Sequence, residues 1–276
     1  MGRCIPFLVV GLLLAGCGRQ EVARDSRAML EQGWNYYRLG EFDVAAKHFT
    51  ALTGNVEAIY ALATTWNLRR PGEDRTKARA LYEQVIREAP DSEWAAWSRL
   101  ALARWLHLVG PDKTPDYEAA RRAYQEVMDR HPRTAAADEA FVFQQTTYLA
   151  GWREEEARVA LPVLERFWQE RADSAWRTLA NGLIARAHQI LKQPDEWLAA
   201  LVRGLAATEV DPLNPKPDRA GHFWQIATVA EFEAGNFAVA REYYRRFMTD
   251  YPTDARVYQA KQALARMDAV EARLRP

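Results

Sequence analysis

The sequence has few of the residues that build chemical sites. It contains only two cysteines, five histidines and four serines among 276 residues, and it has no Gly-rich phosphate-binding loop. Ser98 lacks the G-x-S-x-G motif of hydrolases, while Ser26, Ser92 and Ser174 occupy positions typical of helix caps. No two histidines have a metal-ligand spacing; they are His48, His107, His131, His188 and His222. We therefore expect no catalytic residues, no metal site and no cofactor.

The sequence also has no excess of charge and no pattern typical of β-strands. Lys plus Arg and Asp plus Glu both number 37, so a basic nucleic-acid-binding surface is disfavoured. Valine and isoleucine are sparse, and no run alternates between apolar and polar residues. Ten Trp, eleven Tyr and ten Phe accompany many alanines, a combination that suits closely packed helices. The composition predicts an all-α protein.

The N-terminus has the features of a secretory signal peptide. Arg3 provides the positive charge, and residues 5–14 form a nearly uninterrupted apolar stretch. This stretch is too short for a transmembrane helix, which needs about 20 residues to cross a bilayer. One interpretation is an ordinary signal peptide with an incidental cysteine at position 17.

The second interpretation is a lipoprotein signal, because Leu14-Ala15-Gly16-Cys17 resembles the bacterial lipobox at every position. The resemblance implies that residues 1–16 are removed and that Cys17 carries acyl chains such as palmitate, which anchor the protein to a membrane. Gly18, rather than Asp, follows the cysteine, and this favours the periplasmic face of the outer membrane over the outer face of the inner membrane. Residues 17–25 would form a short polar tether.

The remainder of the chain repeats one helical hairpin about six times. Residues 33–52 and 224–252 share a small residue on a first helix, a turn glycine (Gly40, Gly235), and then an alanine and an aromatic on a second helix. The second-helix alanine recurs at intervals of 33 to 43 residues, at positions 45, 78, 120, 157, 200 and 240. Small residues allow the paired helices to approach closely, and rings such as Phe49 and Tyr244 are expected to fill the space between successive hairpins.

This pattern resembles the tetratricopeptide repeat (TPR) and implies an α-solenoid of about six TPR-like hairpins with a C-terminal capping helix. Hairpins 1–5 are assigned to residues 26–208, a Pro-rich loop to 209–220, and the last hairpin with its capping helix to 221–276. The capping helix is indicated by an apolar stripe after residue 254, which consists of Val257, Ala260, Leu264 and Met267.

Two features of the fourth hairpin are open to more than one interpretation. Glu154, Glu155 and Glu156 could resemble catalytic carboxylates, but such a run is more typical of a solvated helix start, where negative charge suits the helix dipole. Pro162 lies in a predicted helix, and we expect either a kink or a helix start there.

The repeat junctions carry a finer resemblance. Phe247, Tyr251, Pro252 and Asp254 resemble repeats of periplasmic envelope proteins, as do Val127 and residues 131–134. These proteins include the BamD-type lipoproteins of outer-membrane protein assembly and the YbgF (CpoB) type. The resemblance implies a non-catalytic interaction scaffold that binds envelope proteins or peptides. An accessory lipoprotein of pilus or secretion assembly, a peptidoglycan-related enzyme and a structural spacer are the alternatives.

In TPR proteins the first helices line a concave, partner-binding groove. Carried over by repeat phase, the groove positions are Arg27, Trp34, Tyr37, Arg38, Arg99, Trp105, Gln145, Tyr148, Arg177, Asn181, His222 and Gln225. Arginine and aromatic side chains are typical anchors for peptides, because they offer forked donors and a large contact area. The aromatic members could equally be core residues that fill helix interfaces.

Overall fold

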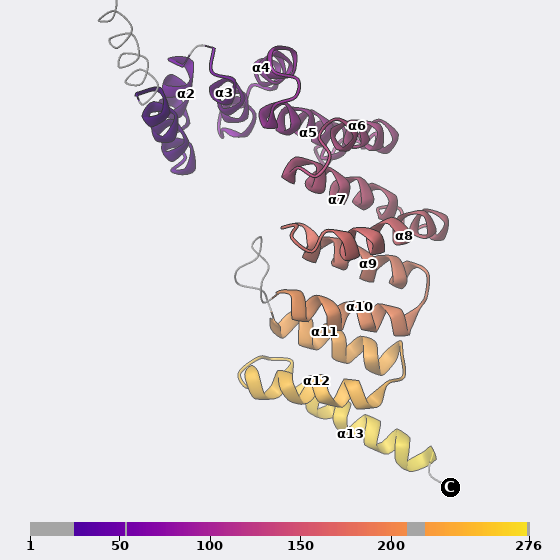
Figure 1. Cartoon of the computed structure of the whole chain (residues 1–276). Helices are drawn as coiled ribbons and strands as arrows, with labels where there is room; N and C mark the ends of the chain where they lie inside the picture. Colours follow the sequence, from indigo (N-terminus) through magenta and orange to yellow (C-terminus); the bar gives the residue numbers. More distant parts are fainter. Residues whose placement is uncertain (1–24, 53, 209–218, 275–276) are drawn as a thin grey trace, which may run out of the picture. The chain divides into compact units, whose positions relative to one another are not determined.

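The computed structural model describes residues 25–52, 54–208 and 219–274, and the regular structure in these ranges is helical (Figure 1). The first helix spans residues 25–38. It is followed by α2 (Phe42–Thr50), α3 (Val56–Leu68), α4 (Arg75–Glu88), α5 (Glu93–His107), α6 (Tyr117–Arg130), α7 (Ala135–Leu149), α8 (Glu154–Glu170), α9 (Arg177–Ile190), α10 (Pro194–Ala207), α11 (Arg219–Phe232), α12 (Phe237–Asp250) and α13 (Val257–Leu274). The predicted signal peptide, Cys17 and most of both the tether and the Pro-rich loop lie outside the described residues.

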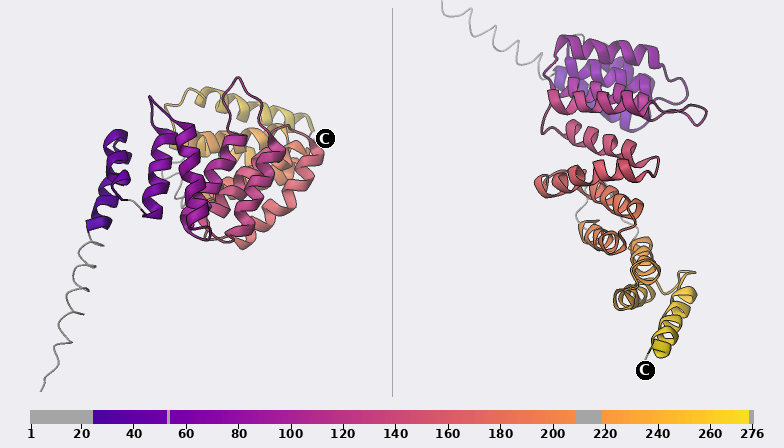
Figure 2. Two further views of the ribbon diagram at one scale, coloured as in Figure 1. Left: turned by 90° about the horizontal axis from the view of Figure 1, so that it is seen from above. Right: turned by 90° about the vertical axis from the view of Figure 1, so that its right-hand side faces the viewer.

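Helices that are adjacent in the chain pair into antiparallel hairpins. The helix at 25–38 precedes α2, and the later pairs are α3 with α4, α5 with α6, α7 with α8, α9 with α10, and α11 with α12 (Figures 1 and 2). The chain divides into two compact units, Met1–Ala136 and Ala137–Pro276, which contain the first three and the last three hairpins respectively. The prediction of an all-α fold, built as an α-solenoid of TPR-like hairpins, is confirmed.

The repeated alanines lie at the centre of this packing. Ala45, Ala78, Ala120, Ala157 and Ala240 are fully buried, and Ala200 is 3% exposed. A methyl group at this position allows the second helix to lie directly against the first. One helical turn later, a large side chain fills the space beside the hairpin, and those at Phe49, Tyr82, Tyr124 and Tyr244 are all buried. The sequence period of the alanines is therefore the period of the helix pairs.

The hairpin turns follow the predicted chemistry, and of the three predicted serine caps only Ser92 is confirmed. Gly40 and Gly235 adopt φ angles of +80° and +63°, a region that side-chain-bearing residues rarely occupy. Ser92 is the N-cap of α5, and its Oγ accepts a hydrogen bond of 3.1 Å from the Ala95 amide. Ser174 instead accepts from the Trp176 amide before α9 begins, and Ser26 lies within the first turn of helix 25–38.

The acidic run and Pro162 both lie in α8, and the predicted capping helix is α13. Glu154–Glu156 form the acidic first turn of α8, where Glu154 pairs with Arg158 and Glu156 with Arg153. The helix continues through Pro162, so a helix start at that residue is wrong. In the second unit, the stripe of α13 packs against the same hydrophobic cluster as α11 and α12, as expected of a capping helix.

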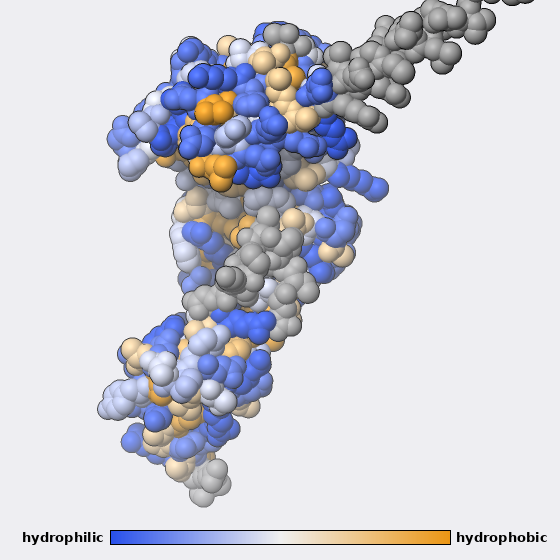
Figure 3. Space-filling view, turned by 90° about the vertical axis from the view of Figure 1, so that its left-hand side faces the viewer, coloured by the Kyte–Doolittle hydropathy of each residue, from blue (hydrophilic) through white to orange (hydrophobic). Residues whose placement is uncertain are grey.

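The described surface is mixed in character. On the face drawn in Figure 3, hydrophobic residues are interspersed with hydrophilic ones. None of the described helices combines the length and the apolar character that are required to cross a bilayer.

Candidate partner-binding groove

The predicted groove residues of the first hairpin differ in what they contact. Arg27 and Arg38 are exposed on helix 25–38; Arg27 pairs with Glu31 at 3.2 Å, and Arg38 donates to the Asn35 side chain at 3.0 Å. Trp34 and Tyr37 are partly buried and pack against the core of this hairpin. Trp34 packs edge-on against Phe49 and donates from Nε1 to Glu57 Oε1 at 3.0 Å. Trp34 therefore ties the first hairpin to α3 while part of its surface stays accessible.

The predicted residues of the third hairpin form interhelical hydrogen bonds. Trp105 donates to Asn67 Oδ1 of α3 at 3.1 Å. The Arg99 side chain is 10% exposed and donates to the Pro90 carbonyl at 3.1 Å and to His131 Nε2 at 3.0 Å. Burial lowers the pKa of His131, and the Arg99 guanidinium lowers it further. The neutral imidazole is therefore the form that accepts this hydrogen bond.

In the fourth and fifth hairpins, three of the predicted residues are packed against their neighbours. Arg177 lies over the Trp168 ring at 3.8 Å and donates to the Trp168 carbonyl. Gln145 is buried and donates to the Gln144 side chain, and Tyr148 packs against the core of α7, α8 and α9. The structure places these residues mainly in helix packing, and their contact with a partner stays a prediction.

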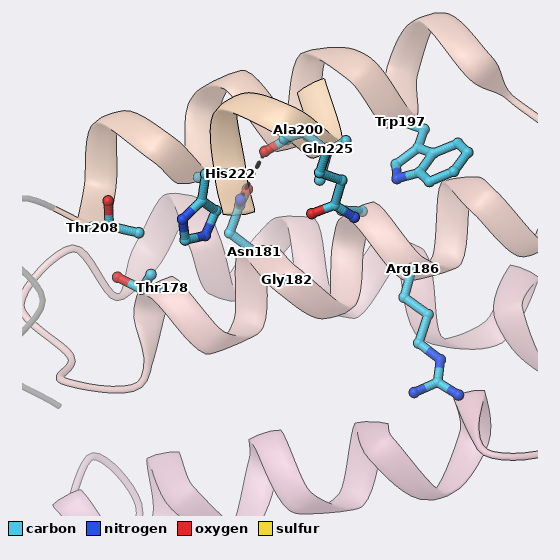
Figure 4. Close-up of a pocket in the computed structure, with 12 residues that line it drawn as sticks. Thr178, Asn181, Gly182, Arg186, Trp197, Ala200, Thr208, His222 and Gln225 are labelled. Atoms are coloured by element: carbon cyan, nitrogen blue, oxygen red, sulfur yellow. Dashed lines mark hydrogen bonds between the residues drawn. The ribbon is translucent and has the colours of Figure 1, made fainter. Parts of the chain in front are cut away.

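The last three predicted residues converge on one hollow. Asn181 from α9 and His222 and Gln225 from α11 line a cavity of about 200 Å³, and α10 supplies the rest of the wall (Figure 4). The full lining consists of Thr178, Asn181, Gly182, Ala185 and Arg186 of α9, Trp197, Ala200, Leu201, Gly204 and the adjoining Thr208 of α10, and His222 and Gln225 of α11. Because α9 and α11 are the first helices of consecutive hairpins, the hollow lies where the repeat phase predicts the groove.

The hollow lies where the fifth hairpin lacks the large side chain of the other repeats. The position four residues after the repeated alanine is aromatic in four hairpins and leucine in the fourth, but in the fifth it is Gly204. Part of the missing volume is taken by Asn181, since a Cβ at position 204 would lie 2.7 Å from Asn181 Nδ2. The rest stays open.

Asn181 is held rigidly within this wall. Its Nδ2 donates to the Ala200 carbonyl at 2.9 Å, and its Oδ1 accepts from Arg203 Nε at 2.6 Å. Arg203 in turn pairs with Glu165 of α8 at 3.3 Å and lies over the Trp168 ring. This buried amide is therefore part of the structure of the wall, and the hydrogen-bonding groups that can meet a ligand come from other residues.

Next to Asn181, α9 presents Gly182 (Figure 4). This residue is exposed, and no atom lies within 4 Å of the position that a Cβ would occupy. Gly182 and Gln225 are both exposed, so the hollow is open to solvent. A side chain from a bound segment can therefore enter between α9 and α11 without displacing the protein.

The chemistry of the lining suits recognition of a polypeptide. Hydroxyl, amide, imidazole and indole groups surround a floor of small residues, and the twelve lining residues include no carboxylate. Within the described ranges, no group of His, Cys, Asp and Glu side chains could hold a metal ion. Asn181, His222 and Gln225 were predicted from repeat phase and line this hollow, and their contact with a partner stays a prediction. Sequence reasoning did not single out Gly182 or Gly204; the signal for Gly204 is a glycine at a position that is larger in the other repeats.

Comparison with known proteins agrees with this architecture. The sequence profile described as "tetratricopeptide repeat" matches residues 27–55, 57–92 and 223–254. No match is found among curated proteins. Among solved structures, the APC/C hetero-tetramer Cut9-Hcn1 is similar with a TM-score of 0.52 at 14% sequence identity, over 88% of this chain and 42% of that chain. The P58(IPK) TPR domain is similar with a TM-score of 0.36 at 17% identity, over 90% of this chain and 67% of that domain.

The profile match and the similarity to Cut9-Hcn1 bear on the fold. The chain spans less than half the length of the first structure, and identities of this size show shared architecture alone. The matched segments cover the first two hairpins and the last one, with the N-cap region of α5 included in the second match. The repeats predicted from alanine spacing in these hairpins thus match the tetratricopeptide-repeat profile.

Proposed function

We propose that this tetratricopeptide-repeat protein is a non-catalytic interaction scaffold, tethered by lipid on Cys17 in the bacterial cell envelope, which docks a segment of a partner protein in the hollow between α9, α10 and α11. The TPR fold is that of protein-interaction scaffolds. The observation that carries the docking proposal is that three residues predicted from repeat phase meet at an open hollow of about 200 Å³. A cavity of this size accommodates a side chain of the bound segment, with backbone contacts along the exposed faces of α9 and α11.

The envelope location is supported by the sequence. Residues 1–17 combine a basic start, a short apolar stretch and the sequence Leu14-Ala15-Gly16-Cys17. The repeat junctions at 131–134 and 251–254 resemble those of envelope-assembly lipoproteins, and this resemblance favours a role in outer-membrane or envelope assembly. An accessory role in pilus or secretion assembly is the alternative within the same class.

The anchor is tested by the substitution Cys17→Ser. Acyl chains contribute about 0.8 kcal/mol for each buried CH₂ group, so their loss should release the protein from the membrane. We expect the wild type in the outer-membrane fraction and the C17S variant in the soluble fraction after sucrose-gradient separation. An unchanged distribution of the variant would show that Cys17 does not anchor the protein.

The docking proposal is tested by closing the hollow. A Cβ at position 182 would meet no atom within 4 Å, so we expect Gly182→Leu to block a bound segment and preserve the fold. Ala199→Leu, on the exposed side of α10, is the matched control. We expect chemical crosslinking in intact cells to capture defined envelope proteins with the wild type and A199L, and at least about tenfold less with G182L. Equal capture by all three proteins would exclude the hollow as the docking site.

A further inference from the structure

In the first unit, exposed hydrophobic side chains gather at the turns within the hairpins. Five large hydrophobic side chains are exposed in the described part of this unit, and each lies within two residues of the end of a first helix. They are Tyr36, Leu39, Leu68, Leu106 and Leu108. In the second unit, exposed hydrophobic side chains also occur along α8, α9 and α13. Single exposed apolar residues are ordinary, but a concentration of them along one edge marks an interaction surface.

The turns of the first three hairpins are neighbours in space. Arg69, directly after α3, forms an ion pair of 3.0 Å with Asp43 in the first turn of α2. Trp105, near the end of α5, donates to Asn67 Oδ1 near the end of α3 at 3.1 Å. The three turns therefore form one edge of the unit, which we call the turn edge and which consists of residues 36–43, 66–79 and 105–116.

The middle turn of this edge carries an excess of positive charge. Arg75 and Arg79 are one helical turn apart on α4, and both lie over the Trp105 ring, at 5.8 and 5.5 Å. Within the described ranges, neither guanidinium forms an ion pair with a carboxylate. The other three cations of this turn are paired, Arg69 with Asp43, Arg70 with Glu73 and Lys77 with Asp74. Over the whole turn edge, seven Lys and Arg accompany six Asp and Glu, so apolar contact rather than net charge must dominate binding there.

The proposed lipid anchor can bring the turn edge to a bilayer. Asp25 follows Cys17 by eight residues, and a chain of this length reaches at most about 26 Å. The helix at 25–38 is about 21 Å long, and the turn edge begins at its C-terminal end. The tether is therefore long enough to span the length of this helix, so the acyl chains and the turn edge can meet the same membrane surface.

We infer that the turn edge of the first unit lies on the bilayer surface, where the exposed leucines of its three turns enter the interface and the guanidiniums of Arg75 and Arg79 bind lipid phosphates. This inference rests on the proposed lipid anchor, which holds the first unit close to the membrane. A bilayer is favoured over a protein partner because each turn carries its leucines apart from those of the next, with polar residues between them. The bilayer interface accepts such individually projecting side chains, with cations at the level of the headgroups.

The contact is weak by itself. A few leucine side chains bury much less apolar surface than acyl chains do, so the turn edge orients the anchored protein and does not replace the anchor. The forked guanidinium of arginine matches a phosphate with two parallel hydrogen bonds, and the Trp105 ring already supports both guanidiniums.

The test measures which positions of the vesicle-bound protein contact lipid. Protein purified from cell membranes is reconstituted into vesicles of phosphatidylethanolamine and phosphatidylglycerol that contain a nitroxide-labelled phospholipid. The variants Leu39→Cys, Leu68→Cys and Leu108→Cys each carry the fluorophore nitrobenzoxadiazole, which nitroxides quench on contact. These leucines are 76%, 50% and 49% exposed, and the matched controls Leu274→Cys and Leu179→Cys replace leucines that are 76% and 47% exposed. We expect quenching on the turn edge to exceed that at the controls at least about fivefold.

The role of the two arginines is tested in the L68C protein. Arg75→Gln combined with Arg79→Gln should lower quenching at position 68 at least about twofold, because two attractions to anionic lipid are lost. Arg87→Gln, an exposed change at the other end of α4, is the control and should leave the quenching unchanged. Unchanged quenching in the R75Q/R79Q protein would overturn the assignment of these arginines to lipid phosphates.

The quenching pattern decides this inference, while the mass of the peptide that contains Cys17 decides the anchor. Equal quenching at the edge and control positions would overturn the inference. Labels on the edge that are shielded from water but are not quenched would show a protein on this surface, which also overturns it. Quenching specific to the edge in a protein without acyl chains on Cys17 would support the inference and reject the proposed anchor.

Discussion

At the scale of single residues, two glycines of the fifth hairpin decide whether the groove has a hollow. Gly204 stands where four of the other repeats have a ring and the fourth repeat has a leucine, and Asn181 packs against it within 2.7 Å of where a Cβ would lie. Gly182 has no atom within 4 Å of the same position. Both are helical glycines, so each lowers the stability of its helix by about 1 kcal/mol relative to alanine. We nevertheless expect a methyl group to change the free energy of unfolding in opposite directions at the two positions.

We expect Gly182→Ala to raise the free energy of unfolding by about 1 kcal/mol, since it improves helix propensity without a clash. Gly204→Ala should lower it by about 1–3 kcal/mol, because the methyl group displaces Asn181 from its hydrogen bonds to Ala200 and Arg203. Urea unfolding followed by circular dichroism measures both changes. Stabilisation by G204A would contradict the packing of Asn181 against α10.

At the scale of elements, Arg99 of α5 joins the ends of α4 and α6 through two hydrogen bonds. Arg99 of α5 donates to the Pro90 carbonyl after α4 and to His131, the residue that ends α6. His131 is 6% exposed. The surrounding charges are those of Arg99 and Arg130, which oppose protonation of the imidazole, and of Asp91, which favours it. Burial and the two arginines together lower the pKa of His131 below its ordinary value of 6.5.

This contact predicts a loss of stability in mild acid. Below pH 6.5, His131 is protonated to a greater extent in the unfolded chain than in the folded chain. The unfolded state therefore binds more protons, and the free energy of unfolding decreases as the pH is lowered. His131→Gln retains an oxygen that can accept from Arg99 and removes the titration. We expect the stability difference between pH 7.5 and pH 5.5 to be smaller in H131Q than in the wild type. His107, whose pKa is also lowered by burial, contributes equally to both proteins.

The elements themselves were predictable from the sequence, and the reason is local. An alanine followed by a ring one turn later, with a glycine turn before it, specifies a hairpin whose contacts are mostly between neighbours in the chain. Gly40 and Gly235 therefore indicated the turns correctly. The role of individual groove residues was harder to predict. Trp34 and Arg99 lie at the predicted first-helix positions, but their side chains also form hydrogen bonds to residues outside their own helices. Repeat phase predicts which face of a helix a residue lies on, but how deeply its side chain is buried depends on the neighbouring helices.

At the scale of the whole molecule, the described helices form two units of three hairpins, and the hollow between α9, α10 and α11 lies in the second unit. The hollow could not be predicted from composition, because it arises from a departure from the repeat at Gly204. Comparison of the six repeats position by position would have found it, since five of the six carry a large residue there. The proposed lipid anchor and the proposed docking site concern different parts of the chain, and each proposal can fail without the other.

The central claim is that a partner protein lies between α9 and α11, directly over Gly182. Incorporation of the photo-crosslinking amino acid benzoylphenylalanine at position 182 tests this in living cells, with position 199 on the exposed side of α10 as the control. We expect irradiation to produce a discrete crosslinked product from position 182 and none of the same size from position 199. No product from position 182, or the same product from both positions, would contradict the claim.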